Sequence, residues 1–276
     1  MGALRLPAHL RGARTRRAYN RGVSETAKRV ALIDSGKGLL PTAKWIHRLA
    51  PEVEVLLETD PEGGPWGERD PGDVVERVFA MARHARDHGA NAIALACNTA
   101  SIVAREPLRE QFEPRLPIIA TVPAVKPAAA RHQRFAVWAT ATTARSEYLE
   151  DLISVFATGR DVSVVGSHDL AAQIEAGDEA GIETAVQHLV AETPKDVEAV
   201  VLGCTHYPLV SDVIARHLPE GVALFDSAEA VARQTLRRMR IAPSADVAAF
   251  AADSSFAAAG VRRADELEWA IRHHLD

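Results

Sequence analysis

The chain has 276 residues, of which 47% are apolar and 25% are charged, the proportions of an ordinary soluble globular protein with one large or two modest domains. A formal net charge of −5 argues against a nucleic-acid surface over the whole molecule, and no apolar run approaches the length of a membrane span. The two cysteines are too few for a disulfide framework, which favours a reducing, cytoplasmic location.

The first 28 residues differ from the rest of the chain in their charge. Eight Lys or Arg stand between Met1 and Arg29 against one acid, Glu25, and no apolar stretch follows them. A basic head without an apolar stretch is not a secretory signal. We expect residues 1–28 to be a disordered tail or the product of an upstream start, and a weak role in binding an anionic surface stays open.

From Arg29 onward, short apolar runs alternate with helical patterns. Strands are expected over 29–33, 53–57, 92–96, 117–121, 135–139, 162–166, 199–203 and 222–225. A helix is expected over 74–88, where apolar residues fall on one face and Gly89 is placed to end the helix. Strands that are buried on both faces and separated by helices indicate parallel sheets in an α/β fold.

Two stretches of the chain match each other. Val75 and Ile182 each begin a helical stripe, and each is followed 22 residues later by a cysteine, Cys97 or Cys204, after a turn and a strand. This repeat indicates two pseudo-symmetric α/β lobes, although any α/β chain repeats a helix–strand unit and that simpler explanation stays open. The predicted division is residues 29–120 plus 228–276 for the first lobe and residues 121–227 for the second.

Both cysteines stand just past a predicted strand end and precede a helical pattern. Ligands of open parallel sheets bind at the carboxyl ends of the strands, so both thiols are expected to face one cleft between the lobes. A helix N-terminus favours an anion and should lower a thiol pKa from about 8.5 toward neutrality. Two thiols on opposite faces of a carbon can remove a proton from one side and return one on the other, which inverts a stereocentre.

Other interpretations of the two cysteines stay open at this point. They can be buried structural residues behind core strands, or zinc ligands together with His206. A redox pair is a further alternative, although the chain has no Cys-x-x-Cys motif. Pyridoxal phosphate is disfavoured because none of the five lysines stands in a recognisable phosphate-binding motif.

Five segments, IDSGKG, PWG, ACNTAS, ATATTARSEY and LGCTHYPLV, resemble the motifs of glutamate racemases in the aspartate/glutamate racemase superfamily and occur in the same order. The similarity runs from about Arg29 to the C-terminus, and GCTHYPL is its most specific block. Aspartate racemases usually carry an acid at the position of His206, so this residue favours the glutamate branch. The resemblance implies two α/β domains, an active site between them, and racemisation of glutamate without a cofactor or a metal.

The resemblance also implies roles for individual residues. Cys97 and Cys204 are the implied catalytic acid and base, with Cys97 acting on the D enantiomer and Cys204 on the L enantiomer. Asp34 and His206 are implied to assist the thiols in catalysis, with Asp60 and Glu175 in supporting places. The implied substrate-binding residues are Ser35, Pro65, Trp66, Gly67, Asn98, Thr99, Thr140, Thr143 and Thr205.

Each assisting residue has a structural interpretation as well. Asp34 can cap a turn, His206 can be a packed histidine, and Glu175 can be a solvated helix acid. The polar residues after the cysteines, Asn98, Thr99 and Thr205, can cap the helices that follow them.

The chain departs from the family pattern at four positions. Leu39 replaces the last glycine of Asp-Ser-Gly-x-Gly-Gly, Trp66 replaces a tyrosine, Arg69 replaces a common lysine, and Ala139 replaces a glycine. We expect these positions to lie where substrate is recognised or where the domains hinge. A racemase for another amino acid such as aspartate, or a non-catalytic amino-acid-binding relative, therefore stays an alternative.

The resemblance also predicts partners and a cellular role. Family members make D-glutamate for peptidoglycan, and hence for cell-wall biogenesis and cell shape, and they often form dimers. A small amino-acid substrate and a possible homodimer are therefore expected, with no nucleic-acid or membrane partner.

Overall fold

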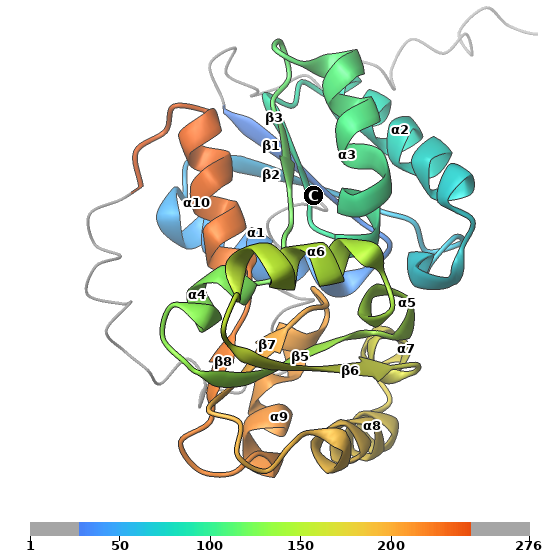
Figure 1. Cartoon of the computed structure of the whole chain (residues 1–276). Coiled ribbons are helices and arrows are strands. Elements are labelled where there is room, and N and C mark those ends of the chain that lie inside the picture. Colours follow the sequence, from blue (N-terminus) through green and yellow to red (C-terminus); the bar gives the residue numbers. More distant parts are fainter. Residues whose placement is uncertain (1–27, 244–276) are drawn as a thin grey trace, which may run out of the picture.

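The computed structural model describes residues 28–243 and contains two lobes, each built on a four-stranded parallel sheet flanked by helices (Figure 1). The predicted α/β fold class with two similar lobes is confirmed. The basic tail expected over 1–28 and the part of the first lobe expected beyond residue 243 lie outside the described residues, apart from Lys28.

The first sheet has the strand order β2-β1-β3-β4. Its strands are β1 (Arg29–Asp34), β2 (Glu54–Thr59), β3 (Ala92–Leu95) and β4 (Ile118–Ala120). The helices between them are η1 (Lys37–Leu39), α1 (Leu40–Leu49), η2 (Trp66–Glu68), α2 (Pro71–Asp87) and α3 (Asn98–Phe112), where η marks a 3₁₀ helix.

The second sheet repeats this order as β6-β5-β7-β8. Its strands are β5 (Arg134–Thr140), β6 (Asp161–Ser167), β7 (Ala199–Leu202) and β8 (Ala223–Phe225). The helices that accompany it are α4 (Val125–Ala129), α5 (Ala141–Ala144), α6 (Glu147–Phe156), α7 (Leu170–Ala176), α8 (Glu179–Glu192), η3 (Tyr207–Val210) and α9 (Ser211–His217).

Each sheet is buried on both faces, as a parallel sheet requires. In β1, Val30 and Leu32 pack with α1 and α10 (Ala228–Arg238), while Ala31 and Ile33 pack with α2 and α3 on the opposite face. The second sheet is covered by α4 and α6 on one face and by α7, α8 and α9 on the other. The predicted strands are all present, because continuous apolar runs suit strands that are covered on both sides.

The helix expected over 74–88 is α2, and it begins earlier than the apolar pattern indicates. The carboxylate of Asp70 caps its N-terminus by accepting from the backbone N–H groups of Gly72 and Asp73, and Pro71 fills the first helical position. At the other end, Gly89 adopts a φ of +82°, a conformation that ends a helix at little cost for glycine.

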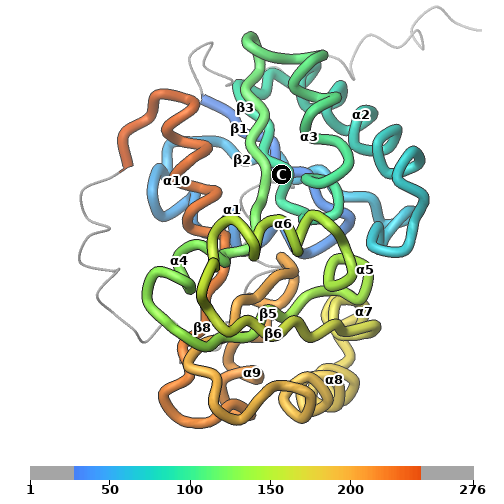
Figure 2. The backbone as a smooth tube through the Cα atoms, viewed as in Figure 1, coloured from blue at the N-terminus to red at the C-terminus, as the bar shows by residue number. Residues whose placement is uncertain are grey.

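The chain passes between the lobes twice. It leaves the first lobe after β4 and returns after β8, where α10 packs against α1 and the first sheet (Figure 2). Within residues 28–243, no helix combines the length and the apolar character needed to cross a bilayer.

Candidate active site

A cleft lies between the lobes, at the carboxyl ends of both sheets. It encloses about 710 Å³ of space between atoms, part of it open to solvent. Cys97, Cys204 and His206 line it. So do the residues to which the resemblance assigns substrate binding: Ser35, Pro65, Trp66, Gly67, Asn98, Thr99, Thr140, Thr143 and Thr205.

The two cysteines reach the cleft from equivalent places in the two lobes. Cys97 follows β3 and Cys204 follows β7, the strand that holds the same position in the second sheet. Both residues are free thiols with only 8% of their surface exposed. Each lobe therefore supplies one thiol to the same cleft.

The environment of Cys97 differs from the sequence-based expectation. Burial raises the pKa of this thiol well above its ordinary value, and the neighbouring carboxyl of Asp34 raises it further. The backbone N–H groups of Ala100 and Thr99, at the start of α3, lower this pKa but do not offset the burial. The expectation of a pKa near neutrality is therefore wrong for Cys97, because desolvation outweighs the helix terminus.

Cys204 does not directly precede an α-helix. The helical pattern after it divides into the 3₁₀ helix η3 and the short helix α9, which begins only at Ser211. Its sulfur instead lies 3.9 Å from Nδ1 of His206. A histidine beside Cys204 thus replaces the helix terminus that the sequence pattern predicts for this thiol.

His206 is held from its other ring nitrogen by Glu175, with 2.9 Å between Nε2 and Oε2. Burial by itself lowers the pKa of His206, but the hydrogen bonds with Cys204 and Glu175 and the charge of Asp34 outweigh it and raise this pKa well above its ordinary value. Burial raises the pKa of Glu175, yet its bonds with His206 and the Lys37 N–H give a net lowering. The geometry therefore favours an imidazolium between a carboxylate and a sulfur.

Asp34, the last residue of β1, is fully buried. Its Oδ1 accepts from the backbone N–H of Gly36 at 2.8 Å, and its Oδ2 accepts from the Thr205 hydroxyl at 3.2 Å. Burial raises its pKa to about 6, although His206 and these two donors act in the opposite direction. Asp34 therefore titrates near physiological pH, in a position next to Cys97.

Polar contacts join the lobes across the cleft. Glu175 of α7 accepts from the backbone N–H of Lys37 at 2.8 Å, and a Cβ at Gly36 would lie only 2.3 Å from the Glu175 carboxylate. The Asn98 side-chain amide donates to the Gly203 carbonyl at 2.8 Å. Asn98 Oδ1 is buried and accepts no hydrogen bond from the residues that the structure describes.

Thr140 and Thr143 form the wall of the second lobe. Thr140 caps α5 by accepting from the Thr143 backbone N–H, and the two hydroxyls lie 3.0 Å apart. Capping does not exclude ligand binding here, because both residues also line the cleft.

Three of the four departures from the family pattern do not line the cleft. Leu39 and Ala139 are buried in the cores of the two lobes, and Arg69 pairs with Asp73. The side chains of Leu39 and Ala139 fill core space, so neither contacts the cleft directly. That these positions lie where substrate is recognised or where the domains hinge stays a prediction. Trp66 alone belongs to the lining.

Further residues of the second lobe line the cleft without having been predicted: Ala141, Thr142, Ser167, His168, Ala171, Ala172 and Gly203. Ser167 ends β6 and His168 follows it, so the rule that ligands bind past strand ends identifies both. Glu68, in η2 of the first lobe, also belongs to the lining.

The zinc alternative finds no support in the geometry. Among residues 28–243, no three His, Cys, Asp or Glu side chains are grouped in a way that could hold a metal ion. The two thiols and His206 therefore do not form part of a metal site in the described structure.

Comparison with known proteins agrees with this geometry. Residues 42–235 match the Asp/Glu/Hydantoin racemase family. The chain belongs to this family. The resemblance drawn from the motifs is thereby confirmed, as is the class of enzyme, a racemase.

Several glutamate racemases are similar to the chain. The glutamate racemase of Salmonella gallinarum is 37% identical over 220 residues, which cover 77% of each protein. The structure of Escherichia coli glutamate racemase, in complex with L-glutamate and the activator UDP-MurNAc-Ala, is 31% identical with a TM-score of 0.73, covering 79% of this chain and 84% of that one. The structure of Thermus thermophilus glutamate racemase in complex with β-chloro-D-alanine is 30% identical in sequence with a TM-score of 0.64. The match covers 78% of this chain and 81% of that one.

Proposed function

We propose that this protein interconverts L-glutamate and D-glutamate by a two-thiol acid–base mechanism that needs no cofactor. The observation that carries the proposal is that Cys97 and Cys204 line one cleft from equivalent strands of opposite lobes. Membership of the racemase family and the similarity to glutamate racemases support the substrate.

In the proposed reaction, one thiolate removes the α-proton and the opposite thiol protonates the carbanion from the other face. With L-glutamate, Cys204 is the base and Cys97 is the acid, and the roles reverse with D-glutamate. Nδ1 of His206 lies beside the Cys204 sulfur, while burial favours the protonated form of Cys97. In the D direction, the carboxylate form of Asp34 is the neighbouring base that accepts the proton which Cys97 gives up, and the resulting neutral carboxyl no longer repels the thiolate.

The substrate is proposed to use polar groups that line the cleft. Backbone N–H groups at the start of α3 and the Thr99 hydroxyl suit the α-carboxylate, and Thr205 lines the cleft near them. Asn98 Oδ1, buried without a donor among residues 28–243, suits the α-ammonium group. The hydroxyls of Thr140 and Thr143 suit the carboxylate of the substrate side chain. Ser35, Pro65, Trp66 and Gly67 form the remaining wall.

The wider setting follows from this reaction. Production of D-glutamate supports a role of the protein in peptidoglycan synthesis. The two free thiols are typical of a protein of the reducing cytoplasm. For the domains, we retain the division into 29–120 plus 228–276 and 121–227, supported within the described residues by the two sheets and by α10 packing on α1.

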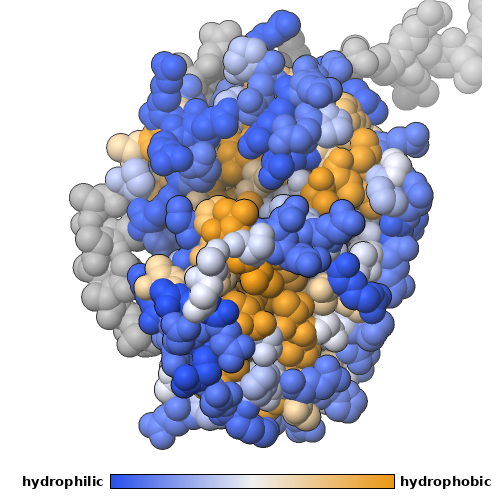
Figure 3. Space-filling view, viewed as in Figure 1, coloured by the Kyte–Doolittle hydropathy of each residue, from blue (hydrophilic) through white to orange (hydrophobic). Residues whose placement is uncertain are grey.

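A homodimer is also proposed. Exposed apolar side chains gather over α6 and the neighbouring edge strand β6, where Val155, Phe156 and Val164 lie (Figure 3). Such a patch is typical of a contact surface. The molar mass of the purified protein, measured by light scattering, tests this proposal.

The test of the function is circular dichroism of the purified protein with L-glutamate, D-glutamate and a panel of other amino acids. With either glutamate enantiomer as the substrate, we expect the circular-dichroism signal to decay to zero as the racemic mixture forms. Racemisation of another amino acid in preference to glutamate would instead support the alternative substrate. No activity on any amino acid would favour the binding-protein alternative.

Substitution of the thiols tests the mechanism. Cys97→Ser and Cys204→Ser should each abolish racemisation, because a serine hydroxyl is a far weaker acid than a thiol. Each variant should still exchange the α-hydrogen of one enantiomer with deuterium through its remaining thiol. Full racemase activity in either variant would contradict the two-thiol mechanism. Loss of the far-ultraviolet circular-dichroism spectrum of the folded protein would indicate instead that the cysteines have a structural role.

A further inference from the structure

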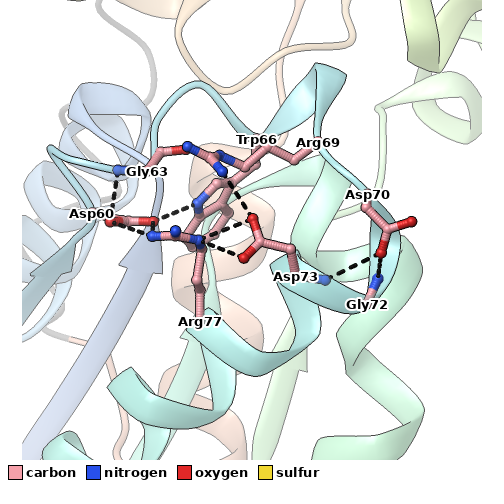
Figure 4. Close-up of polar contacts among 8 residues, drawn as sticks. All are labelled: Asp60, Gly63, Trp66, Arg69, Asp70, Gly72, Asp73 and Arg77. Carbon is pink, nitrogen blue, oxygen red and sulfur yellow. Dashed lines mark hydrogen bonds and ion pairs between the residues drawn. The ribbon is translucent and has the colours of Figure 1, made fainter.

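The loop between β2 and α2 forms one wall of the cleft, through Pro65, Trp66, Gly67 and Glu68. This loop also contacts both α3, which follows Cys97, and α5 of the other lobe. Residues 60–65 of the loop form no strand or helix, so polar side-chain contacts at its two ends help to fix its position. Figure 4 shows the polar network that supplies these contacts.

Asp60, at the start of the loop, is the centre of this network. Its Oδ1 accepts from the backbone N–H of Gly63 at 2.9 Å, and its Oδ2 accepts from the indole Nε1 of Trp66 at 2.9 Å. Nη1 of Arg77 contacts both carboxylate oxygens, at 3.2 and 3.0 Å. Burial raises the pKa of Asp60, but the bonds from Trp66 and Arg77 outweigh it, so the carboxyl is held ionised.

Arg77 ties this carboxylate to helix α2. While Nη1 contacts Asp60, Nε donates to both oxygens of Asp73 at 3.0 and 3.1 Å, one turn earlier on the helix. Arg69, at the far end of the loop, donates to the Gly63 carbonyl and, at 2.9 Å, to Asp73. The guanidinium of Arg77 therefore links the beginning and the end of the loop through two carboxylates (Figure 4).

Trp66 is an anchor of the loop in this arrangement. Its side chain is only 1% exposed, and its single donor, Nε1–H, is used by Asp60. Gly63 permits the close approach, because a Cβ there would lie 2.0 Å from Asp60 and 2.2 Å from Arg77. Trp66 and Arg69, two of the departures from the family motifs, thus belong to one network.

We propose that Arg77 is a positioning residue of the racemase, which acts through Asp60 and Trp66 to hold the wall formed by Pro65–Glu68 against the substrate. The inference rests on the glutamate racemase function proposed above. Arg77 itself is not among the residues that line the cleft, so it influences the reaction only through the loop. Arginine suits this role because its planar fork serves two carboxylates at once, which a lysine ammonium does not.

The test is Arg77→Gln, with Arg83→Gln as the matched control on an exposed turn of the same helix. A displaced wall should raise KM for both glutamate enantiomers and reduce kcat/KM by about tenfold to a hundredfold, since a small misplacement in a site has effects of this order. Arg77→Lys should recover part of the loss, because it keeps the charge on Asp60 but cannot span both carboxylates. Arg83→Gln should keep the kinetics of the wild type.

A double variant tests whether Arg77 acts through Asp60. The loss of kcat/KM in Arg77→Gln/Asp60→Asn should be no greater than the larger single loss, because residues of one network are not additive. If Arg77→Gln does not fold, Asp60→Asn alone should show the same rise in KM. Unchanged KM and kcat in folded Arg77→Gln would overturn the inference.

Hydrogen exchange separates failure of this inference from failure of the proposed function. In Arg77→Gln, backbone amides of residues 61–69 should exchange at least about tenfold faster than in the wild type, while the strands exchange as before. If the wild type does not racemise glutamate, the proposed function fails, and this exchange alone decides whether Arg77 positions the loop. Unchanged exchange over 61–69 would contradict the inference whatever the activity.

Discussion

Cys97 and His206 line the cleft, while Glu175 bonds to His206 and Asp34 to Thr205 behind it. The pKa of each of these four side chains is displaced from its ordinary value. Burial is the largest influence on the pKa of each of the four, and the charged or hydrogen-bonding partner differs from one to the next. The hydrogen bonds of His206 with Cys204 and Glu175 favour the charged imidazolium. The carboxyl of Asp34, in contrast, disfavours the charged thiolate of Cys97. Groups of one site are thus held in different protonation states, as acid–base chemistry on two faces requires.

Asp34 provides a prediction at the scale of the residue. Its pKa is raised from 3.8 to about 6 in the folded protein, so deprotonation favours unfolding. The folded state therefore loses stability as the pH rises from about 4 through 6 and stays at the lower level above that. Two pKa units correspond to about 2–3 kcal/mol.

Asp34→Asn should remove this pH-dependent loss. The variant should exceed the wild type in free energy of unfolding by about 2–3 kcal/mol at pH 8, and the difference should narrow as the pH falls through 6. Racemase activity should fall at the same time. Urea unfolding at a series of pH values measures the difference, and Asp151→Asn, at an exposed position of α6, should show none. A wild type that is equally or more stable at pH 8 would contradict the prediction.

At the scale of the elements, the strand ends decide where the thiols stand. Gly203 joins β7 to Cys204, donates its N–H to the Trp138 carbonyl of β5 and accepts from Asn98 of the other lobe. A Cβ on this residue would lie 2.8 Å from the Trp138 carbonyl oxygen, which is backbone and cannot rotate away. The glycine is required here by the close approach of two strands.

Gly203→Ala should therefore shift the end of β7 and Cys204 with it. We expect a loss of about 1–3 kcal/mol in the free energy of unfolding, the usual cost of overpacking, together with a lower kcat. Gly67→Ala is the control for stability, because its added Cβ meets nothing closer than Thr140 Oγ1 at 3.9 Å. Thermal or urea unfolding of the two variants measures the contrast, and equal stabilities would show that β7 adapts without cost.

The elements also show what the sequence can and cannot predict. Strand positions follow from apolar runs, and the equivalence of Cys97 and Cys204 follows from a spacing of 22 residues, because both depend on local pattern. The pKa of Cys97 does not follow, since burial depends on what packs over the residue. The pairing of Arg77 with Asp60 across 17 positions is a tertiary contact between a loop and a helix, with no periodic signal.

At the scale of the whole molecule, the lobes are joined by two passages of the chain and by a few polar contacts over the cleft. Asp34 with Thr205, Asn98 with Gly203, and Lys37 with Glu175 are such contacts. Each exchanges a bond with water for a bond between lobes and contributes only about 1 kcal/mol. The relative position of the lobes is therefore sensitive to anything that binds both walls.

A bound amino acid would contact both walls and should stabilise the whole molecule. At a concentration of 100 times its Kd, a ligand that binds only the folded state adds about 2.7 kcal/mol, which corresponds to a rise of roughly 5–10 °C in Tm. The measurement is calorimetry of Cys97→Ser or Cys204→Ser with increasing D-glutamate or L-glutamate, so that no turnover occurs. L-lysine at the same concentrations should raise Tm less than glutamate does, because the hydroxyls of Thr140 and Thr143 suit a carboxylate and Glu68 is the one acid among the described residues that line the cleft. An equal rise with L-lysine, or none with glutamate, would be incompatible with a glutamate site between the lobes.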